Sequence, residues 1–228
     1  MPYLAMTGAE IDHCSELPPK LGYMACHFSS YSTGLSNLPR YIPEKSLLII
    51  NDRTPIHGHD PDRICDQLED ILSRFSCRGI LLDFQRESEE APAIIQKLLS
   101  LPCPVIVSSL FAEKLDCPIF LPPVPLPIPL EGYLAPFAGR EIWLEAALDG
   151  LQLTLTEDGC AATPLSAQFN ESLPHREEEL CCHYRIEITS ETAIFTLRRT
   201  KEDLKDLLSR ANQLGITGAV GLYQELGD

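Results

Sequence analysis

An acid and an amide stand two positions apart where a buried strand is predicted to end. The stretch Cys77–Arg86 reads CRGILLDFQR, and its apolar run gives way to Asp83 and Gln85. Near-continuous apolar runs of this kind are typical of strands buried on both faces of a parallel sheet. A carboxyl group at a strand end can transfer a proton, whereas an amide can only donate and accept hydrogen bonds. The alternative is that Asp83 simply caps the following turn.

A second polar segment, residues 51–60 (NDRTPIHGHD), follows another apolar run. His57 and His59 form a His-x-His pair with an acid beside them, and such groups can bind zinc or iron. Metal-binding barrels carry this pair on a strand, whereas here it lies in a loop that contains Gly and Pro. We therefore expect no metal, and keep a metal-dependent hydrolase that uses residues 57–60 as an alternative. Asn51 and Asp52, at the strand end, are better candidates for ligand contacts.

Buried strands and amphipathic helices alternate along most of the chain, which predicts a parallel α/β sheet with right-handed crossovers. Strands are expected at Gly22–Phe28, Ser46–Asn51, Gly79–Phe84, Pro104–Ser109, Pro118–Leu121 and Gly218–Tyr223. Helices are expected near 61–75, 89–101 and 200–214. Two connections are too short or too rich in proline to hold a full helix. The fold class is therefore a reduced or distorted (β/α)8 TIM-type barrel, over a single domain of residues 1–228.

The remaining segments depart from this rhythm. Residues 1–20 are expected to be irregular, and the proline-rich segment 122–136 to be an extended loop. Residues 141–197 are rich in hairpin signals, with one hairpin around Asp149 and Gly150 and another around residues 189–192. Between these hairpins, residues 158–180 form a surface excursion. The only tryptophan, Trp143, is expected in the core or packed on the first hairpin.

The amino-acid composition limits the cellular compartments and the classes of binding partner that are expected. The formal net charge of −15 argues against binding to nucleic acid or to anionic membranes, which require clustered Lys and Arg. Nine cysteines at irregular spacings indicate a reducing compartment rather than a disulfide framework. The first 21 residues lack the features of a signal peptide, and no apolar run reaches membrane-spanning length. We expect a cytoplasmic protein without a cofactor, and the oligomeric state stays open.

The strand at residues 78–85 resembles the active-site strand of the family 18 glycoside hydrolases, whose pattern is D-G-x-D-x-D-x-E. The last Asp of the pattern falls on Asp83, and the catalytic Glu falls on Gln85. The two earlier acidic positions fall on Arg78 and Leu81. In that family the Glu protonates the glycosidic oxygen, and the Asp orients the substrate's N-acetyl group, which attacks the anomeric carbon. The resemblance implies a barrel whose proton donor is missing.

The C-terminal part resembles the same family, in its chitinase and spore peptidoglycan hydrolase members. A hairpin, a helix over residues 200–215 and a closing strand over residues 218–227 follow one another in the family's order. Tyr223 lies at the position where the family usually has a tryptophan, whose ring forms the floor of the sugar-binding subsite. The two matching segments cover about 60 residues. Together with Asp83 and Gln85, the residues that would contact ligand are Tyr223, Phe28, Tyr31, Asn51, Asp52 and Glu225.

Three functions follow from this resemblance. The first is an inactive barrel that binds an N-acetylated glycan of the chitin or peptidoglycan type, because Gln85 cannot act as a general acid. The second is a glycosidase whose acid has moved to another residue, such as Glu87 or Glu225. The third is a scaffold or interaction protein that has lost the groove.

Overall fold

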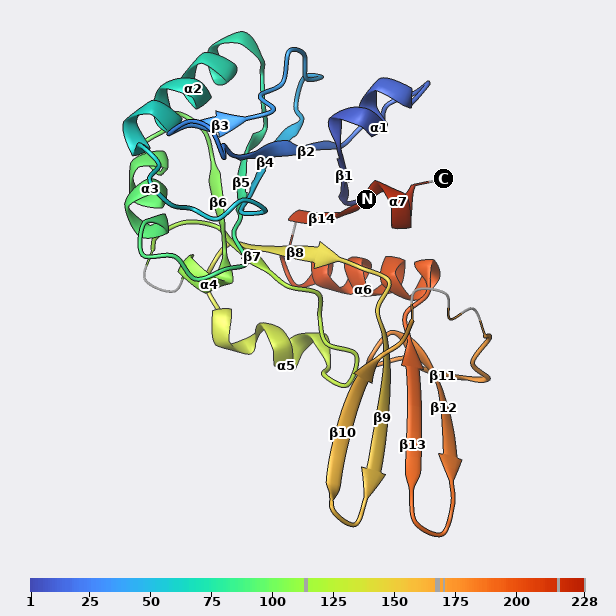
Figure 1. Cartoon of the computed structure of the whole chain (residues 1–228). Helices are drawn as coiled ribbons and strands as arrows, with labels where there is room; N and C mark the ends of the chain where they lie inside the picture. Colours follow the sequence, from blue (N-terminus) through green and yellow to red (C-terminus); the bar gives the residue numbers. More distant parts are fainter. Residues whose placement is uncertain (113–114, 167–168, 170, 217, 228) are drawn as a thin grey trace. The chain divides into compact units, whose positions relative to one another are not determined.

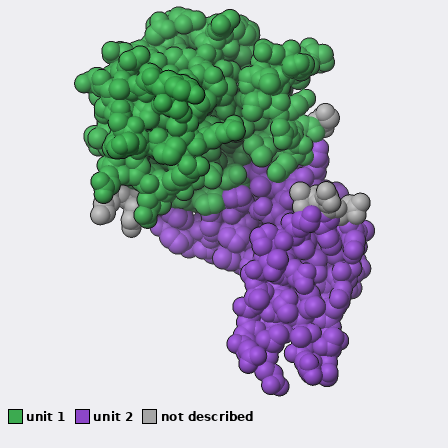
Figure 2. Space-filling model, viewed as in Figure 1, with its two compact units in different colours: residues 1–122, 140–145, 218–228 green, residues 123–139, 146–217 purple. Residues whose placement is uncertain are grey.

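The computed structural model describes residues 1–112, 115–166, 169, 171–216 and 218–227. The chain groups into two compact units, which Figure 2 colours separately. The first unit comprises Met1–Pro122, Arg140–Glu145 and Gly218–Asp228, and the second comprises Pro123–Gly139 and Ala146–Thr217.

A closed parallel barrel forms the first unit (Figure 1). Its sheet has nine strands in the order β1-β14-β8-β7-β6-β5-β4-β2-β3, and β1 also pairs with β2. The short strand β3 pairs only with β2, in the antiparallel direction, and is not part of the ring. The other eight strands form the closed parallel ring. The strands are β1 Tyr3–Met6, β2 Leu21–Phe28, β3 Leu35–Ser36, β4 Leu47–Asn51, β5 Gly79–Asp83, β6 Val105–Ser108, β7 Ile119–Leu121, β8 Ile142–Ala146 and β14 Gly218–Leu222. The predicted TIM-type α/β fold is confirmed.

Short helices make this a reduced barrel, as the sequence predicted. The helices of the first unit are α1 Gly8–His13, α2 Pro61–Arg74, α3 Ala91–Leu98, α4 Ser109–Ala112 and α7 Tyr223–Leu226. Asp60 starts α2 by accepting hydrogen bonds from the amides of Asp62 and Arg63, and the helix buries Ile64 and Leu68. Among the described residues, no helix combines the length and apolar character needed to cross a bilayer.

The barrel interior is filled with apolar side chains from every strand of the ring, and β2 contributes the partly buried Met24. The buried cluster consists of Ala5, Leu47, Ile49, Leu81, Ile106, Phe120, Trp143 and Val220. Trp143 therefore belongs to the core, and its ring lies against Gly218 on β14. A Cβ atom built on Gly218 would lie 2.1 Å from Cδ2 of Trp143, so only glycine fits there. The tryptophan and the glycine fill this part of the barrel together.

Three sequence-based expectations about the order of helices and strands were wrong. Residues 1–20 contain a barrel strand and a helix, β1 and α1, rather than irregular chain. No hairpin turns at Gly150, because the preceding strand, β8, pairs in parallel with β7 inside the barrel. The segment 122–136 contains helix α5 Leu130–Leu134 and the start of a 3-10 helix, Ala135–Phe137, rather than only extended loop.

The second unit holds a five-stranded antiparallel sheet in the order β10-β9-β13-β12-β11. Its elements are α5 Leu130–Leu134, the 3-10 helix Ala135–Phe137, β9 Gly150–Thr156, β10 Gly159–Pro164, β11 His175–Glu177, β12 Cys182–Ile188, β13 Ala193–Arg198 and α6 Lys201–Gln213. The hairpin predicted around residues 189–192 is present, with Ile188 paired to Ala193. The expected excursion over residues 158–180 contains β10 and β11, and its residues 167, 168 and 170 lie outside the described part of the chain.

Candidate functional site

Asp83 and Gln85 contact each other at the carboxyl end of β5. The Gln85 Nε2 atom donates a hydrogen bond of 3.2 Å to Asp83 Oδ1. Burial raises the pKa of Asp83; the hydrogen bond from Gln85 opposes this shift, and the nearby Asp52 adds to it. Gln85 itself is exposed. The pair therefore offers one partly buried carboxyl group and one accessible amide.

Asp52, one position beyond β4, fixes the backbone that carries Gln85. Its side chain is buried, and Oδ2 accepts hydrogen bonds from the amides of Gln85 at 3.1 Å and Arg86 at 2.8 Å. The sequence predicted a ligand contact for Asp52, but its carboxylate faces the turn after β5. We therefore describe Asp52 as a positioning residue for Gln85.

Three polar side chains from neighbouring strands lie in one layer. In the strand register His27 pairs with Asn51, and Asn51 pairs with Asp83. Interior residues precede Asn51 and Asp83 by two positions on their strands, so alternation turns both side chains toward the barrel interior. On β2 the register shifts between Tyr23 and Cys26. Beyond this irregularity, the side chains of β2 that would have pointed outward point inward. His27, rather than Phe28, therefore lies on the same face of the sheet as Asn51.

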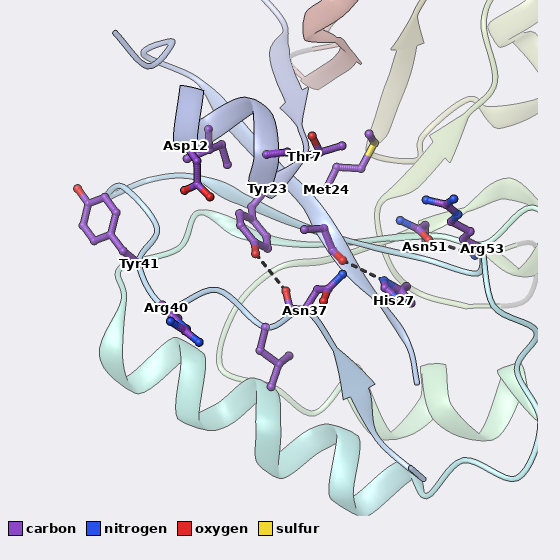
Figure 3. A pocket seen from close by; sticks show the side chains of 15 residues that line it. Thr7, Asp12, Tyr23, Met24, His27, Asn37, Arg40, Tyr41, Asn51 and Arg53 are labelled. Atoms are coloured by element: carbon purple, nitrogen blue, oxygen red, sulfur yellow. Dashed lines mark hydrogen bonds between the residues drawn. The ribbon is translucent and has the colours of Figure 1, made fainter. Parts of the chain in front are cut away.

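A cavity of about 800 Å³ opens beside this layer (Figure 3). It is lined by Thr7, Gly8, Ala9, Ile11, Asp12, Tyr23, Met24, Ala25, His27, Asn37, Leu38, Arg40, Tyr41, Asn51 and Arg53. Figure 3 places Arg40 and Tyr41 on one side of it, and Asn51 and Arg53 on the other. His27 and Asn51 belong both to the cavity and to the layer that contains Asp83. Cavities of this size are typical of small-molecule and oligomer sites.

The predicted aromatic contacts divide into a buried and an exposed group. Phe28 is 0% exposed and packs edge-on against His59 and at a tilt against Phe84, so it belongs to the core and offers no face to a ligand. Tyr31, in the loop after β2, is 99% exposed. Tyr223 begins α7, and its hydroxyl lies 3.7 Å from the sulfur of Cys14.

The remaining predicted contact, Glu225, lies on α7 and is partly buried. On the same helix, the Gln224 side chain hydrogen-bonds the Glu10 carboxylate of α1. The structure therefore joins α7 to α1, and it assigns neither Tyr223 nor Glu225 to the layer of His27, Asn51 and Asp83.

The loop of residues 57–60 is held by Glu90 and by the backbone. His57 Nδ1 lies 3.0 Å from Glu90 Oε1, and the amide of Gly58 donates to Glu90 Oε2 at 2.8 Å. His59 Nε2 lies 3.1 Å from the carbonyl oxygen of Ser29. Within the described ranges, no group of three or more His, Cys, Asp or Glu side chains is arranged to hold a metal ion. These contacts give the two histidines a structural explanation.

Sequence reasoning missed the third of the cavity lining that comes from the N-terminal segment, five of its fifteen residues. Thr7 caps α1, and Thr7 and Glu10 form a reciprocal capping box whose T-x-x-E pattern is visible in the sequence. That pattern could have placed a helix, and hence a strand before it, within residues 1–20. Arg40 and Tyr41 follow no strand of the ring directly, and no local pattern marks them.

No protein-family model matches the sequence, and neither does any curated protein. Solved structures do match the fold. The fold is that of the family 18 glycoside hydrolases. A GH18 chitinase double mutant from Cycas revoluta, in complex with (GlcNAc)4, superposes with a TM-score of 0.57 at 11% identity, over 96% of this chain and 94% of that one. The chitinase from Chromobacterium violaceum gives a TM-score of 0.52 at 11% identity, over 100% of this chain and 95% of that one.

The spore cortex-lytic enzyme SleL from Bacillus cereus matches with a TM-score of 0.55 at 11% identity. The match covers 91% of this chain but only 64% of SleL, so this chain spans less than two thirds of that enzyme's length. At such identities the likeness concerns the fold alone.

Proposed function

We propose that the chain is a glycan-binding barrel with the fold of the family 18 glycoside hydrolases, and that it binds N-acetylated glycan without hydrolysing it efficiently. The observation that carries the proposal is the hydrogen bond between Gln85 Nε2 and Asp83 Oδ1 at the carboxyl end of β5. A barrel presents its chemistry at these strand ends. In the family that this chain resembles, the position of Gln85 is occupied by a Glu that protonates the glycosidic oxygen.

The chemistry of the pair supports binding more than turnover. A general acid needs a transferable proton with a pKa near the working pH, and the carboxamide of Gln85 has none. The same carboxamide can donate to and accept from sugar hydroxyl or acetamido groups. Asp83 corresponds to the Asp that orients the substrate's N-acetyl group in that family, so this acidic residue is retained. The cavity beside the pair supplies further polar groups at His27 and Asn51.

A solved neighbour of the same fold was crystallised with (GlcNAc)4, which supports an N-acetylglucosamine oligomer as the first ligand to test. The test compares wild type with Gln85→Glu on chitin oligomers and on peptidoglycan fragments. Cleavage products are followed by mass spectrometry, and the binding of (GlcNAc)4 by calorimetry. We expect (GlcNAc)4 to bind both proteins and only Gln85→Glu to release products.

A matched control is the double variant Gln85→Glu with Asp83→Asn. If the restored activity uses the acetamido group of the substrate, the double variant should lose it, because Asp83 no longer supports that group. Hydrolysis by wild type would overturn the proposal in favour of a relocated acid such as Glu87 or Glu225. Absence of both binding and rescue would favour the scaffold alternative.

A further inference from the structure

Two arginines that pair with no carboxylate among the described residues line the cavity beside the Asp83 layer. Arg40 and Arg53 are both exposed and both contribute to its wall. Within the described residues, neither guanidinium group lies within 4.0 Å of a carboxylate or makes a side-chain hydrogen bond. By contrast, arginines such as Arg74, Arg176 and Arg210 pair with carboxylates elsewhere in the chain.

The charge of the cavity opposes that of the protein as a whole. The formally charged side chains of its wall are two arginines, Arg40 and Arg53, and one acid, Asp12, whereas the formal net charge of the chain is −15. The remaining titratable groups of the wall are His27, Tyr23 and Tyr41, and burial raises the pKa of Tyr23 to about 12. Tyr23 therefore adds no negative charge. A locally positive cavity in an acidic protein concentrates anionic ligands.

Local structure positions these side chains. The amide of Arg53 donates to Asn51 Oδ1 at 3.1 Å, which forms a tight turn directly after β4. This turn places Arg53 next to Asn51, a residue of the Asp83 layer. Arg40 precedes Tyr41, whose side chain is 67% exposed. In Figure 3 the two guanidinium groups lie on different sides of the cavity, with His27 and Asn37 between them.

We propose that this cavity is an anion-selecting subsite, in which Arg53, next to Asn51 of the Asp83 layer, binds the carboxylate of an acidic N-acetylated sugar, and Arg40, on the other side, adds positive charge to the cavity. The inference rests on the proposed function and narrows its ligand class from neutral glycan to carboxylate-bearing glycan. Guanidinium groups bind carboxylates through paired, charge-assisted hydrogen bonds, which a neutral sugar cannot make. The exposed ring of Tyr41 offers an apolar face for the adjoining sugar.

The test uses two disaccharides that differ by one group. GlcNAc–MurNAc carries a lactyl carboxylate, and (GlcNAc)2 lacks it. Dissociation constants for both are measured by calorimetry with the full-length chain. We expect wild type to prefer GlcNAc–MurNAc by about tenfold, the equivalent of one charge-assisted contact. Arg53→Gln and Arg40→Gln should each reduce this preference severalfold and leave (GlcNAc)2 binding within about twofold.

Arg78→Gln is the matched control, because Arg78 is exposed at the opposite end of β5 and undergoes the same loss of charge. It should keep the full preference. Equal affinity of wild type for the two disaccharides would overturn the subsite and leave the proposed function standing. An equal loss in Arg78→Gln would also overturn it, because the effect would then come from overall charge. Failure to bind either disaccharide would overturn the subsite and the proposed function together.

Discussion

The carboxylate of Asp52 reaches from the end of β4 to the backbone of Gln85, where Oδ2 accepts the amide hydrogen at 3.1 Å. The same oxygen accepts the amide of Arg86. One buried side chain therefore fixes the turn that presents Gln85, and it does so from the neighbouring strand.

Replacement of Asp52 by alanine should leave these two amides without a partner. We expect Asp52→Ala to lower the free energy of unfolding by about 1–3 kcal/mol, as measured by urea denaturation. The rescue of hydrolysis by Gln85→Glu should also weaken in the Asp52→Ala background. Asp52→Asn keeps an acceptor oxygen and should lose less than Asp52→Ala. Equal losses in the two variants would show that the amides do not depend on Asp52.

Asp83 should make the stability of the protein depend on pH. Because burial raises the pKa of Asp83 in the folded state, the folded chain holds this proton more tightly than the unfolded chain. The contribution of Asp83 to the free energy of unfolding therefore falls as pH rises from about 4, the pKa of an unfolded Asp, through the folded value. Asp83→Asn cannot ionise, so its stability relative to wild type should increase from pH 4 to pH 7 in urea denaturation. Asp158→Asn, at an exposed hairpin turn, should show no such trend.

Gly218→Ala tests the packing of the barrel interior. The added methyl group would overlap the indole ring of Trp143, so the ring or β14 must move. We expect a loss of about 1–3 kcal/mol in the free energy of unfolding and a shifted fluorescence spectrum, since Trp143 is the only tryptophan. Gly132→Ala, with nothing within 4 Å of the new methyl group, should be neutral or slightly stabilising. A Gly218→Ala variant with wild-type stability and fluorescence would contradict the packing.

Asp203 should stabilise the second unit only above acidic pH. Its side chain is fully buried and accepts hydrogen bonds from the Thr200 hydroxyl at 2.7 Å and from His183 Nδ1 at 2.8 Å. Burial alone would raise its pKa, but the bonds from Thr200 and His183 outweigh burial and lower it. The stabilisation is therefore present above about pH 4 and is lost as pH falls through the folded value.

We expect Asp203→Asn to cost about 2–4 kcal/mol at pH 7, and this cost should shrink toward pH 3 in urea denaturation. Asp206→Asn is the control on the same helix, because the Asp206 side chain is 48% exposed. Its effect should stay within about 1 kcal/mol. A pH-independent loss in Asp203→Asn would show that the charge of Asp203 contributes nothing.

The barrel could be predicted because its strands are buried on both faces. Apolar runs such as Leu47–Asn51 and Gly79–Asp83 stand out without any tertiary information, and the positions of Asp83 and Gln85 at a strand end followed from them. By contrast, β1 has only four residues, and although all four are apolar, so short a run cannot be assigned to a strand from its sequence alone. The parallel partner of β8 is also invisible locally, so a turn signal at residues 149–150 was taken for a hairpin.

The candidate site was less predictable because side-chain direction depends on the register of the strands. A single irregularity in β2 decides which of His27 and Phe28 points toward the barrel interior. No residue type in that strand predicts the irregularity. For this reason Phe28 was expected at the rim and lies in the core. The burial of Asp52 depends on a turn more than thirty positions away, which a local pattern cannot contain.

The place of β14 between β1 and β8 has a consequence for the newly made chain. Tyr3 pairs with Val220 and Ala5 with Leu222, so almost the whole sequence separates the two strands that close the ring. Until the ribosome has released residues 218–222, the nascent sheet has two unpaired edges, at β1 and at β8. Closure over such a sequence separation is slow, and open strand edges invite association. Synthesis of this protein therefore passes through a stage in which protection by chaperones matters more than it does for the finished barrel.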